Sequence, residues 1–412
     1  MKVLILGGGY AGILTAKALE KELRARKDID ITVIDKNPYH TLMTQLHEVA
    51  GGRVVPSAVK IPYGMIFKKG RVKVVQDEIT SFDFTNRKLL SASNSYDYNY
   101  LVIATGSRPN FFGIKSAEKY GYKMWSYKEA VVIRSMVYEQ FSIAAEMGSP
   151  VQRRERLSFV VAGGGFTGVE LAGELASWKK RLCKKFGIDQ REAEVYMIEA
   201  APDILNVLDR KLRDKGKFYL EKMGVKVLTN CAIDRMEGNR IFLNNGSVIS
   251  GSLIWTAGIK GNPYIQKADI DYDEKSNLVN VNEYLQSVSH ENVFSVGDSL
   301  MYIYKDRPVP KVVETCIHSA ELAAKNIVRL LDKKPLVPFH PKYHGSIVSV
   351  GPFYSVAKVG GFKFKWLFAT ALKHLVNIHY VHVIGGLGLC WKYTDDQFVQ
   401  RFVSFLNGKE VL

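Results

Sequence analysis

The stretch Lys2–Gly12, which reads Lys-Val-Leu-Ile-Leu-Gly-Gly-Gly-Tyr-Ala-Gly, decides the fold. Its apolar part, Val3–Leu6, predicts a parallel strand that is buried on both faces. Three glycines with G-x-G-x-x-G spacing come next, and Ile13–Leu23 then has the pattern of a helix. Such a turn brings backbone N–H groups to a pyrophosphate at a helix N-terminus. The three glycines are Gly7, Gly9 and Gly12.

A carboxylate follows at the expected distance. Ile31–Ile34 is a second apolar run, and Asp35 comes directly after it. In dinucleotide-binding folds an acidic residue roughly 20 residues beyond the glycines accepts hydrogen bonds from a ribose. The alternative is a glycine turn without a ligand, but the order strand, turn, helix, strand and acid favours a dinucleotide site.

The same arrangement occurs a second time in the chain. The apolar run Leu157–Val161 precedes a turn with the same glycine spacing, and a further short strand ends at Glu199. Two fingerprints with two carboxylates predict two bound dinucleotides. Because Glu199 would repel a ribose 2′-phosphate, the second dinucleotide is expected to be NADH rather than NADPH. The glycines of this turn are Gly163, Gly165 and Gly168.

Composition sets the broad class. The 412 residues suggest two or three domains. No run of 18 apolar residues occurs, so no membrane-spanning helix is expected. The first predicted strand begins at Val3, so a signal peptide is not expected either. The net charge of +16 fits a Lys-rich surface or an anionic membrane. The chain has no nucleic-acid-binding module pattern, so nucleic acid is not an expected partner.

The cysteines limit the redox chemistry. They are scattered and form no C-x-x-C, so a disulfide framework and a metal site are not expected, and a reducing, cytoplasmic setting fits. A class of flavin reductases has a redox-active cysteine pair shortly after the first nucleotide-binding unit, and this chain has no cysteine there. The four cysteines are Cys183, Cys231, Cys316 and Cys390.

Two further turns complete the pattern. The apolar strand Tyr100–Ala104 runs into Thr105-Gly106, and the strand Asn292–Val296 is closed by Gly297-Asp298. In this order the two turns resemble the second and third signatures of flavoproteins with two dinucleotide-binding domains.

Taken together, these motifs resemble those of the type II NADH:quinone oxidoreductases. These enzymes are single-subunit, non-pumping respiratory dehydrogenases. The resemblance covers essentially the whole chain. Its most specific parts are Gly165-Phe166-Thr167-Gly168-Val169-Glu170 and Trp255-Thr256-Ala257-Gly258, and Tyr39-His40 also fits.

The resemblance implies an α/β fold of two Rossmann-like domains with tightly bound FAD and with NADH as substrate. An FAD domain of residues 1–113 and 264–342 would receive an NADH domain of residues 114–263 as an insertion. Residues 343–412 would form a C-terminal segment for membrane docking and dimer contacts. NADH is expected on the second glycine turn and Glu199. The residues expected at FAD are Gly7, Gly9, Tyr10, Ala11, Gly12, Ile13, Asp35, Lys36, Ile79, Thr105, Gly106, Gly297, Asp298, Val313 and Glu314.

Glu170 lies at the second position after Gly168, where the first turn of a helix is expected. Its spacing alone fits either an acidic residue favoured at a helix N-terminus or a carboxylate near the nicotinamide. The resemblance favours the second reading, because the family has a glutamate at the junction of nicotinamide and quinone.

One segment departs from the family. The quinone motif Ala-Gln-x-Ala-x-Gln is replaced by Val313-Glu314-Thr315-Cys316-Ile317-His318. Glu314 and His318 lie on one helix face and both exchange protons, so with Glu170 they are expected to serve as catalytic residues. Ile317 would line the quinone site. His318 as a polar capping residue and Cys316 as a small core residue are the alternatives.

The tail is aromatic and basic. Residues 362–380 and 396–406 have the pattern of basic amphipathic helices, which lie in a membrane interface. Packing on the core or on a second subunit is the alternative. Lys373 matches a lysine near the family's quinone tunnel, but interfacial snorkelling would also place it.

The resemblance implies a peripheral protein at the cytoplasmic face of the cell membrane, as a homodimer. Two other functions stay open. A sulfide:quinone oxidoreductase would need two cysteines beside the flavin. A non-catalytic flavin redox sensor or electron carrier would not need the intact second fingerprint.

Overall fold

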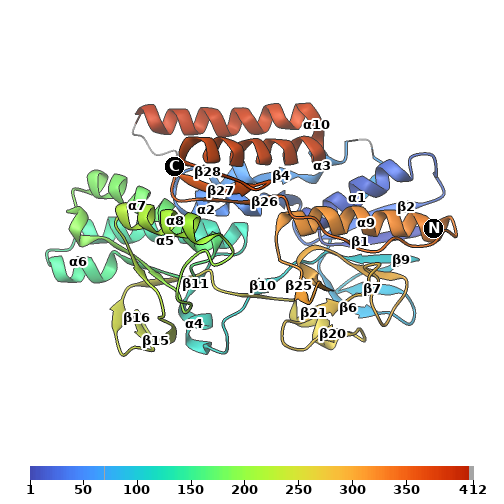
Figure 1. Ribbon diagram of the computed structural model, residues 1–412, viewed down its shortest axis with the longest axis horizontal. Coiled ribbons are helices and arrows are strands. Elements are labelled where there is room, and N and C mark those ends of the chain that lie inside the picture. Colours follow the sequence, from blue (N-terminus) through green and yellow to red (C-terminus); the bar gives the residue numbers. More distant parts are fainter. Residues whose placement is uncertain (69, 408–412) are drawn as a thin grey trace.

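Two parallel five-stranded sheets form the two halves of the molecule in this computed structural model. The structure describes residues 1–68 and 70–407, with side chains described as far as Thr394. The half with α1 and α9 lies on the right of Figure 1, and the half with α5, α7 and α8 lies on the left. The prediction of an α/β fold with two parallel sheets is therefore confirmed.

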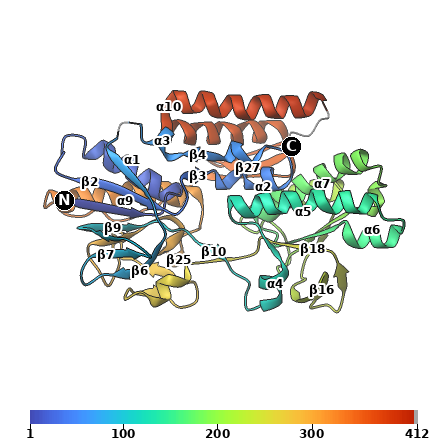
Figure 2. The same ribbon diagram turned by 180° about the vertical axis from the view of Figure 1, so that it is seen from behind.

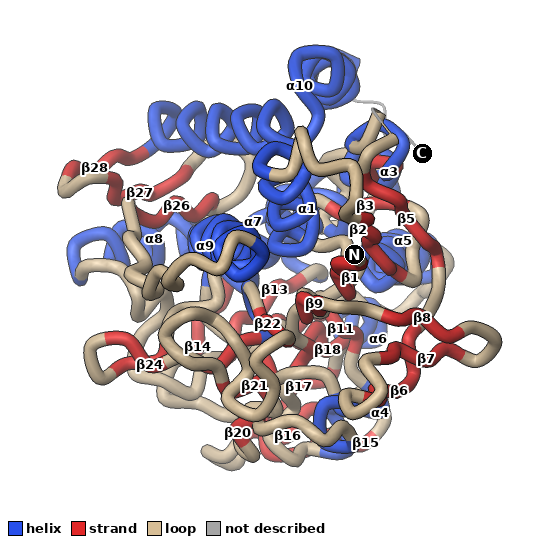
Figure 3. Tube along the Cα trace, turned by 90° about the vertical axis from the view of Figure 1, so that its right-hand side faces the viewer, coloured by secondary structure: helices blue, strands red, loops and turns tan. Residues whose placement is uncertain are grey.

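The first sheet has the strand order β22-β9-β1-β2-β5. Helices α1 and α9 lie on one side of it, and the small antiparallel sheet β6-β7-β8 lies on the other, as Figure 3 shows. The sheet joins segments from both ends of the chain. The strands of this sheet are β1 (Lys2–Leu6), β2 (Asp30–Asp35), β5 (Val72–Gln76), β9 (Tyr100–Ile103) and β22 (Val293–Ser295). The elements that cover it are α1 (Tyr10–Glu22), α9 (Val313–Leu331), β6 (Ile79–Asp83), β7 (Lys88–Ser91) and β8 (Ser95–Asp97).

The second sheet repeats this plan within the middle of the chain, with the order β11-β18-β12-β13-β14. Every residue of β12 is buried, as the apolar pattern predicted. The domain boundaries at residues 113 and 263 stay a prediction. The elements of this half are β11 (Tyr122–Lys123), β12 (Ser158–Ala162), β13 (Glu194–Ile198), β14 (Val225–Leu228), β18 (Ser252–Trp255), α4 (Lys115–Tyr120), α5 (Tyr127–Ala145), α6 (Pro150–Arg156), α7 (Phe166–Phe186), α8 (Arg210–Lys222), β15 (Ile233–Glu237), β16 (Arg240–Leu243) and β17 (Val248–Ser250).

Two chain crossings join the halves. The outgoing crossing, β10 (Arg108–Pro109), pairs antiparallel with the returning one, β19 (Ile259–Lys260). Figure 2 shows these thin connections beneath the helices. The shorter elements are β3 (Tyr39–Thr41), α2 (Leu46–Ala50), β4 (Lys60–Pro62), α3 (Tyr63–Ile66), β20 (Tyr272–Asp273), β21 (Leu278–Asn280), β23 (Leu300–Met301), β24 (Ile303–Tyr304) and β25 (Arg307–Pro308), with 3₁₀ turns at Met43–Gln45, Pro56–Val59, Gln190–Glu192, Pro263–Lys267 and Gly297–Ser299.

The C-terminal part covers the junction from above, where α10 lies in Figures 1 and 2. Strands β26 (Gly345–Ser349) and β27 (Ser355–Val359) pair antiparallel, as expected. Phe362–Lys365 is strand β28 rather than the start of a helix, which corrects the expectation for this segment. Helix α10 (Trp366–Asn407) follows, with a break at Gly386.

The described part of α10, as far as Thr394, exposes large apolar side chains. Phe368 is 79% exposed, Leu387 78% and Trp391 80%. Buried residues such as Val381 and Ile384 lie on its inner side. Among the helices described, none has the length and apolar character to cross a bilayer. The amphipathic pattern predicted at 396–406 concerns side chains outside the described residues.

The two glycine turns have the same geometry. Gly7 has φ of +104° and Gly163 of +105°. A Cβ at Gly12 would collide with the carbonyl oxygen of Gly7, and one at Gly168 with that of Gly163. Helix α1 begins at Tyr10, three residues before the expected start at Ile13, and α7 begins at Phe166. In each case the middle glycine of the turn serves as the N-cap.

This geometry separates two substitutions in one turn. Gly12→Ala places a methyl group against a backbone carbonyl, so we expect it to destabilise the protein by about 2 kcal/mol. Gly9→Ala is the control, because a Cβ there meets no described atom within 4 Å and φ is −75°. Its unfolding free energy should stay within about 0.5 kcal/mol. Urea titration of both variants measures the difference, and equal losses would contradict the assignment.

Candidate active site

The Asp35 carboxylate fixes the conformation of the first glycine turn through hydrogen bonds to its backbone. The backbone N–H of Gly8 donates to Asp35 Oδ2 at 2.6 Å, and that of Asn37 donates to Oδ1 at 2.7 Å. Gly9 begins α1, and no side chain of the described residues caps this helix start. The space beside Gly9 is empty, so the first N–H groups of α1 face a region that fits a pyrophosphate.

The second turn repeats these contacts. The N–H of Gly164 donates to Glu199 Oε2 at 2.5 Å, and that of Ala201 donates to Oε1 at 2.7 Å. Gly165 begins α7 without a side-chain cap from the part of the chain described, and the space beside it is empty as well. Both predicted dinucleotide sites therefore have the same carboxylate-braced loop and open helix start.

The remaining signatures meet beside the first loop. The Ser107 hydroxyl donates to Asp298 Oδ2 at 3.0 Å, although 191 residues separate the two. Burial raises the pKa of Asp298, and it lowers the pKa of Lys311, in the segment before α9, to about 8. The N–H of Gly297 donates to Ser319 Oγ at 2.9 Å, which ties the turn to α9.

The other expected FAD residues surround this region. Tyr10, Ala11, Gly12 and Ile13 are buried in the first turn of α1, and Ile79 is buried at the start of β6. Thr105 and Gly106 precede Ser107 and are partly buried. The Lys36 side chain is 53% exposed, with its ammonium 3.9 Å from Glu78. Val313 and Ile317 are partly buried on α9. These residues thus fit a flavin nucleotide along the first loop.

Glu170 and Lys373 form a buried ion pair. Lys373 Nζ donates to Glu170 Oε1 at 2.5 Å and to Ser349 Oγ at 2.7 Å. The Ser349 N–H and hydroxyl each donate to the same carboxylate oxygen at 3.1 Å. Lys373 is only 8% exposed, so the alternative in which it snorkels at a membrane interface is wrong.

The partners of Glu170 also explain why its carboxylate is ionised. Burial by itself would raise its pKa, but His47, Lys373 and the Ser349 N–H outweigh burial and lower it. The sequence pattern predicted Glu170 in the first turn of its helix. Because α7 begins at Phe166, Glu170 lies in the second turn instead. A simple helix-terminus role therefore does not describe it.

Sequence reasoning missed a group of buried charged residues around this pair. His47 Nδ1 lies 3.4 Å from Glu170 Oε2, and its Nε2 lies 3.3 Å from Lys373 Nζ. Arg53 bridges Glu48 at 3.0 Å and Glu174 at 2.9 Å. The one available signal was a cluster of charges, His47-Glu48 and Arg53, in an otherwise apolar segment.

Glu314 and His318 lie elsewhere on α9. The Glu314 carboxylate accepts from the N–H of His344 at 2.9 Å, and His318 Nδ1 accepts from the N–H of Lys342 at 3.2 Å. His344 directly precedes β26 and Ser349 is its last residue, so the two lie about 16 Å apart at ~3.3 Å per residue. Glu170 is bound at the Ser349 end.

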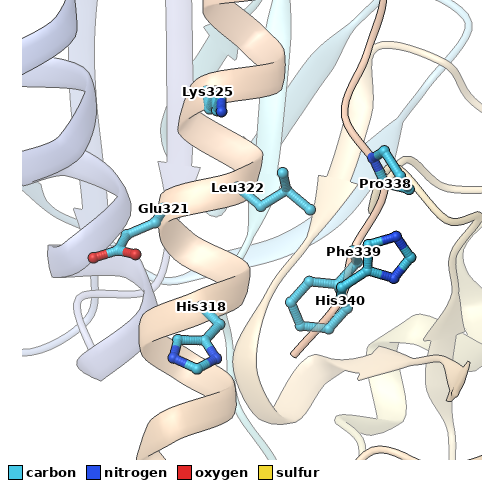
Figure 4. A pocket seen from close by; sticks show the side chains of 7 residues that line it. All are labelled: His318, Glu321, Leu322, Lys325, Pro338, Phe339 and His340. Atoms are coloured by element: carbon cyan, nitrogen blue, oxygen red, sulfur yellow. The ribbon is translucent and has the colours of Figure 1, made fainter. Parts of the chain in front are cut away.

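His318 borders an open depression between α9 and the segment 338–340. Figure 4 shows His318, Glu321 and Lys325 along the helix, with Pro338, Phe339 and His340 across from them. The structure thus brings His318 to this outer surface, together with Leu322. It does not bring His318 to the buried pair.

Cys316 lies on the opposite side of α9 from Glu314 and His318. Its sulfur lies close to Gly297, and its surroundings include Ala11 and Asp298. Burial raises the pKa of this thiol, so it stays protonated. It is a free, partly buried cysteine that packs against the hydrophobic core beside the first site, which agrees with the alternative of a small core residue.

An aromatic contact joins α10 to the first loop. His40 Nδ1 donates to the carbonyl of Gly8 at 3.1 Å, so its Nε2 accepts from the Tyr380 hydroxyl at 2.9 Å. Tyr380 also stacks on Tyr10 at 4.4 Å between ring centroids. The C-terminal helix is thereby fixed to the turn that decides the fold.

Comparisons with known proteins agree with this geometry. The family model described as pyridine nucleotide-disulphide oxidoreductase matches residues 1–320. A protein of Staphylococcus haemolyticus (strain JCSC1435) named type II NADH:quinone oxidoreductase is 30% identical over 397 residues, which cover 95% of this chain and 98% of the relative. A protein of the same name from Staphylococcus aureus (strain NCTC 8325 / PS 47) is 30% identical over 402 residues, with the same coverage.

Solved structures share the fold. The structure of NDH2 from Plasmodium falciparum in complex with NADH has a TM-score of 0.86 at 18% identity, and covers 99% of this chain and 98% of that chain. The sulfide:quinone oxidoreductase of Aquifex aeolicus has a TM-score of 0.76 at 18% identity, and covers 99% and 96%. On the family match and the 30% relatives, the resemblance inferred from the sequence is confirmed, and the chain belongs to the type II NADH:quinone oxidoreductases of the pyridine nucleotide-disulphide oxidoreductase family.

Proposed function

We propose that this protein oxidises NADH and reduces a membrane quinone by two electrons, with FAD on the first loop and NADH on the second. The observation that carries the proposal is the Glu170–Lys373 pair. It joins α7, which begins at the second glycine loop, to α10, whose described part exposes large apolar side chains. FAD, when bound, supplies hydride acceptance and electron delivery.

In the overall reaction NADH, one proton and quinone give NAD⁺ and quinol. The reaction therefore consumes one proton, which comes from water. Glu170 and Lys373 are the groups we assign to this proton. The Lys373 ammonium donates directly to the Glu170 carboxylate, so a proton can pass between the two groups without an intervening water. Their burial keeps this exchange out of bulk solvent.

The partners of Glu314 and His318 give these residues a separate role in the proposal. Glu314 is held by His344, and His318 borders the depression shown in Figure 4. Both are proposed as proton-exchanging groups on the outer side of α9. Ile317 lies beside them as the expected apolar wall. Glu170 and Lys373 carry the main part.

The proposed membrane contact is the outer side of α10. Exposed Phe368, Leu387 and Trp391 would enter the interface of an anionic membrane, to which the net charge of +16 is attracted. The protein would then lie at the cytoplasmic face as a peripheral protein. A homodimer remains a prediction.

Neither alternative function has a specific observation in its favour. A sulfide:quinone oxidoreductase needs two cysteines beside the flavin. Cys316 lies beside the first site, but it is a free cysteine and would need a second thiol there. A non-catalytic sensor would leave the second carboxylate-braced loop without use.

The cofactor assignment predicts a coenzyme preference. Purified protein should be yellow and should bleach with NADH, whereas NADPH should bleach it at least tenfold more slowly, since the Glu199 carboxylate repels a 2′-phosphate. Absorbance at the flavin band in a stopped-flow instrument measures both rates. Equal rates would contradict the role of Glu199, and a colourless protein that takes up no added FAD would contradict the whole assignment.

The proton role predicts the effect of Glu170→Gln. This variant keeps the side-chain shape but cannot carry a proton, so NADH:quinone turnover should fall by roughly 10²-fold. Steady-state rates with a short-chain quinone measure the loss. Glu221→Gln, an exposed glutamate on α8, is the matched control and should keep the parent rate. An unchanged rate in Glu170→Gln would remove this residue from the mechanism.

The membrane proposal predicts that exposed apolar residues can be exchanged without loss of stability. The triple change Phe368→Ser, Leu387→Ser and Trp391→Ser should abolish sedimentation with vesicles of phosphatidylglycerol and keep the melting temperature. Val207→Ser is the control, because Val207 is 81% exposed and lies between β13 and α8, outside α10. Undiminished vesicle binding by the triple variant would contradict the proposal.

A further inference from the structure

We propose that His47 is a positioning residue for the Glu170–Lys373 pair, with its neutral imidazole accepting from Lys373 and presenting its N–H to Glu170. The inference rests on the proposed function, because the pair is the proton-exchanging group there. No functional motif contains His47, and its role is inferred from the contacts that the fold creates. It lies 326 residues from Lys373 in the chain.

The tautomer follows from the donors. Lys373 has N–H donors and no acceptor, so His47 Nε2, at 3.3 Å, must be the acceptor. A neutral imidazole then carries its proton on Nδ1, which lies 3.4 Å from Glu170 Oε2. The acceptor Nε2 of the ring therefore faces the Lys373 ammonium, and the donor Nδ1–H faces the Glu170 carboxylate. Burial lowers the pKa of His47 to about 4, so it is neutral at pH 7.

The two carboxylate oxygens of Glu170 have different surroundings. Oε1 accepts three hydrogen bonds, from Lys373 and from the N–H and hydroxyl of Ser349. Oε2 lies against His47. His47 therefore determines the direction of the second oxygen.

The position of His47 is itself fixed. All five residues of α2 are buried, and Gly51 at its end allows close contact with Glu174 of α7, where a Cβ would collide. Arg53 then joins Glu48 of α2 to Glu174. Gln45, just before α2, donates to the Tyr393 hydroxyl of α10 at 2.7 Å. The imidazole is therefore held from both α7 and α10.

Four charged groups act on this imidazole. Glu170 on α7 and the neighbouring Glu48 raise its pKa, whereas Lys373 on α10 and Arg53 lower it. A second proton would place an N–H of His47 against the Lys373 ammonium and turn the acceptor into a donor. The neutral form is thus the one that keeps the arrangement.

The variants His47→Asn and His47→Leu test the proposal in the full-length holoenzyme. Asn keeps a donor near the Nδ1 position, so turnover should fall about tenfold, whereas Leu keeps neither contact and should lose more. The KM for NADH should not change, because the NADH loop is not altered. His290→Gln is the control, since His290 is half-buried and its ring contacts Asp269 and Phe84 rather than the Glu170–Lys373 pair.

Coupling to Glu170 separates positioning from a general structural effect. In the Glu170→Gln background, His47→Asn should slow turnover by less than about twofold further, because its effect acts through Glu170. Full multiplication of the two losses, or a parent rate in both His47 variants while Glu170→Gln is slow, would overturn the proposal. Absence of NADH:quinone turnover in the parent protein would instead overturn the proposed function.

A spectroscopic measurement decides the point without turnover. With ¹⁵N-labelled histidine, the signal lost in His47→Asn should show a neutral ring protonated at Nδ1 between pH 6 and pH 8. A cationic ring, or one protonated at Nε2, in that range would overturn the inference. Melting temperatures within a few degrees of the parent protein confirm that the variants are folded.

Discussion

The buried ion pair between Glu170 and Lys373 is the constraint on which the arrangement of the C-terminal part depends. Taking two charges out of water costs several kcal/mol each, so the pair is stable only with good geometry and further hydrogen bonds. Ser349 and His47 supply these contacts. Since the four residues come from β26, α2, α7 and α10, the position of each element depends on the others. A shift of α10 along its axis would leave a buried charge without its partner.

The two glycine loops show how one solution serves two sites. Asp35 and Glu199 differ by one methylene, yet each accepts one backbone N–H from its glycine loop and one from two residues further along the chain. The carboxylate therefore shapes the loop before any ribose arrives. A bound ribose would meet a preformed acceptor, which lowers the ordering cost of binding.

Local patterns predicted the main strands, both loops and their carboxylates, because each of these features depends on residues close in sequence. The buried site could not be predicted in the same way, since Lys373 and Glu170 are 203 residues apart and no periodicity relates them. The error at Phe362–Lys365 was avoidable. Phe-Lys-Phe-Lys alternates with the period of a strand, and the helix begins only where the alternation ends.

Helix α9 shows why the replaced glutamines do not by themselves decide the electron acceptor. Each residue turns a helix by about 100°, so Glu314 and His318 lie about 200° from Cys316, on the far side of α9. Cys316 faces the Gly297 turn, whereas Glu314 faces His344. The replacements thus change the outer side of α9 and leave the Glu170–Lys373 pair untouched. An acceptor that meets this pair would retain the same proton donor whichever residues occupy the outer side.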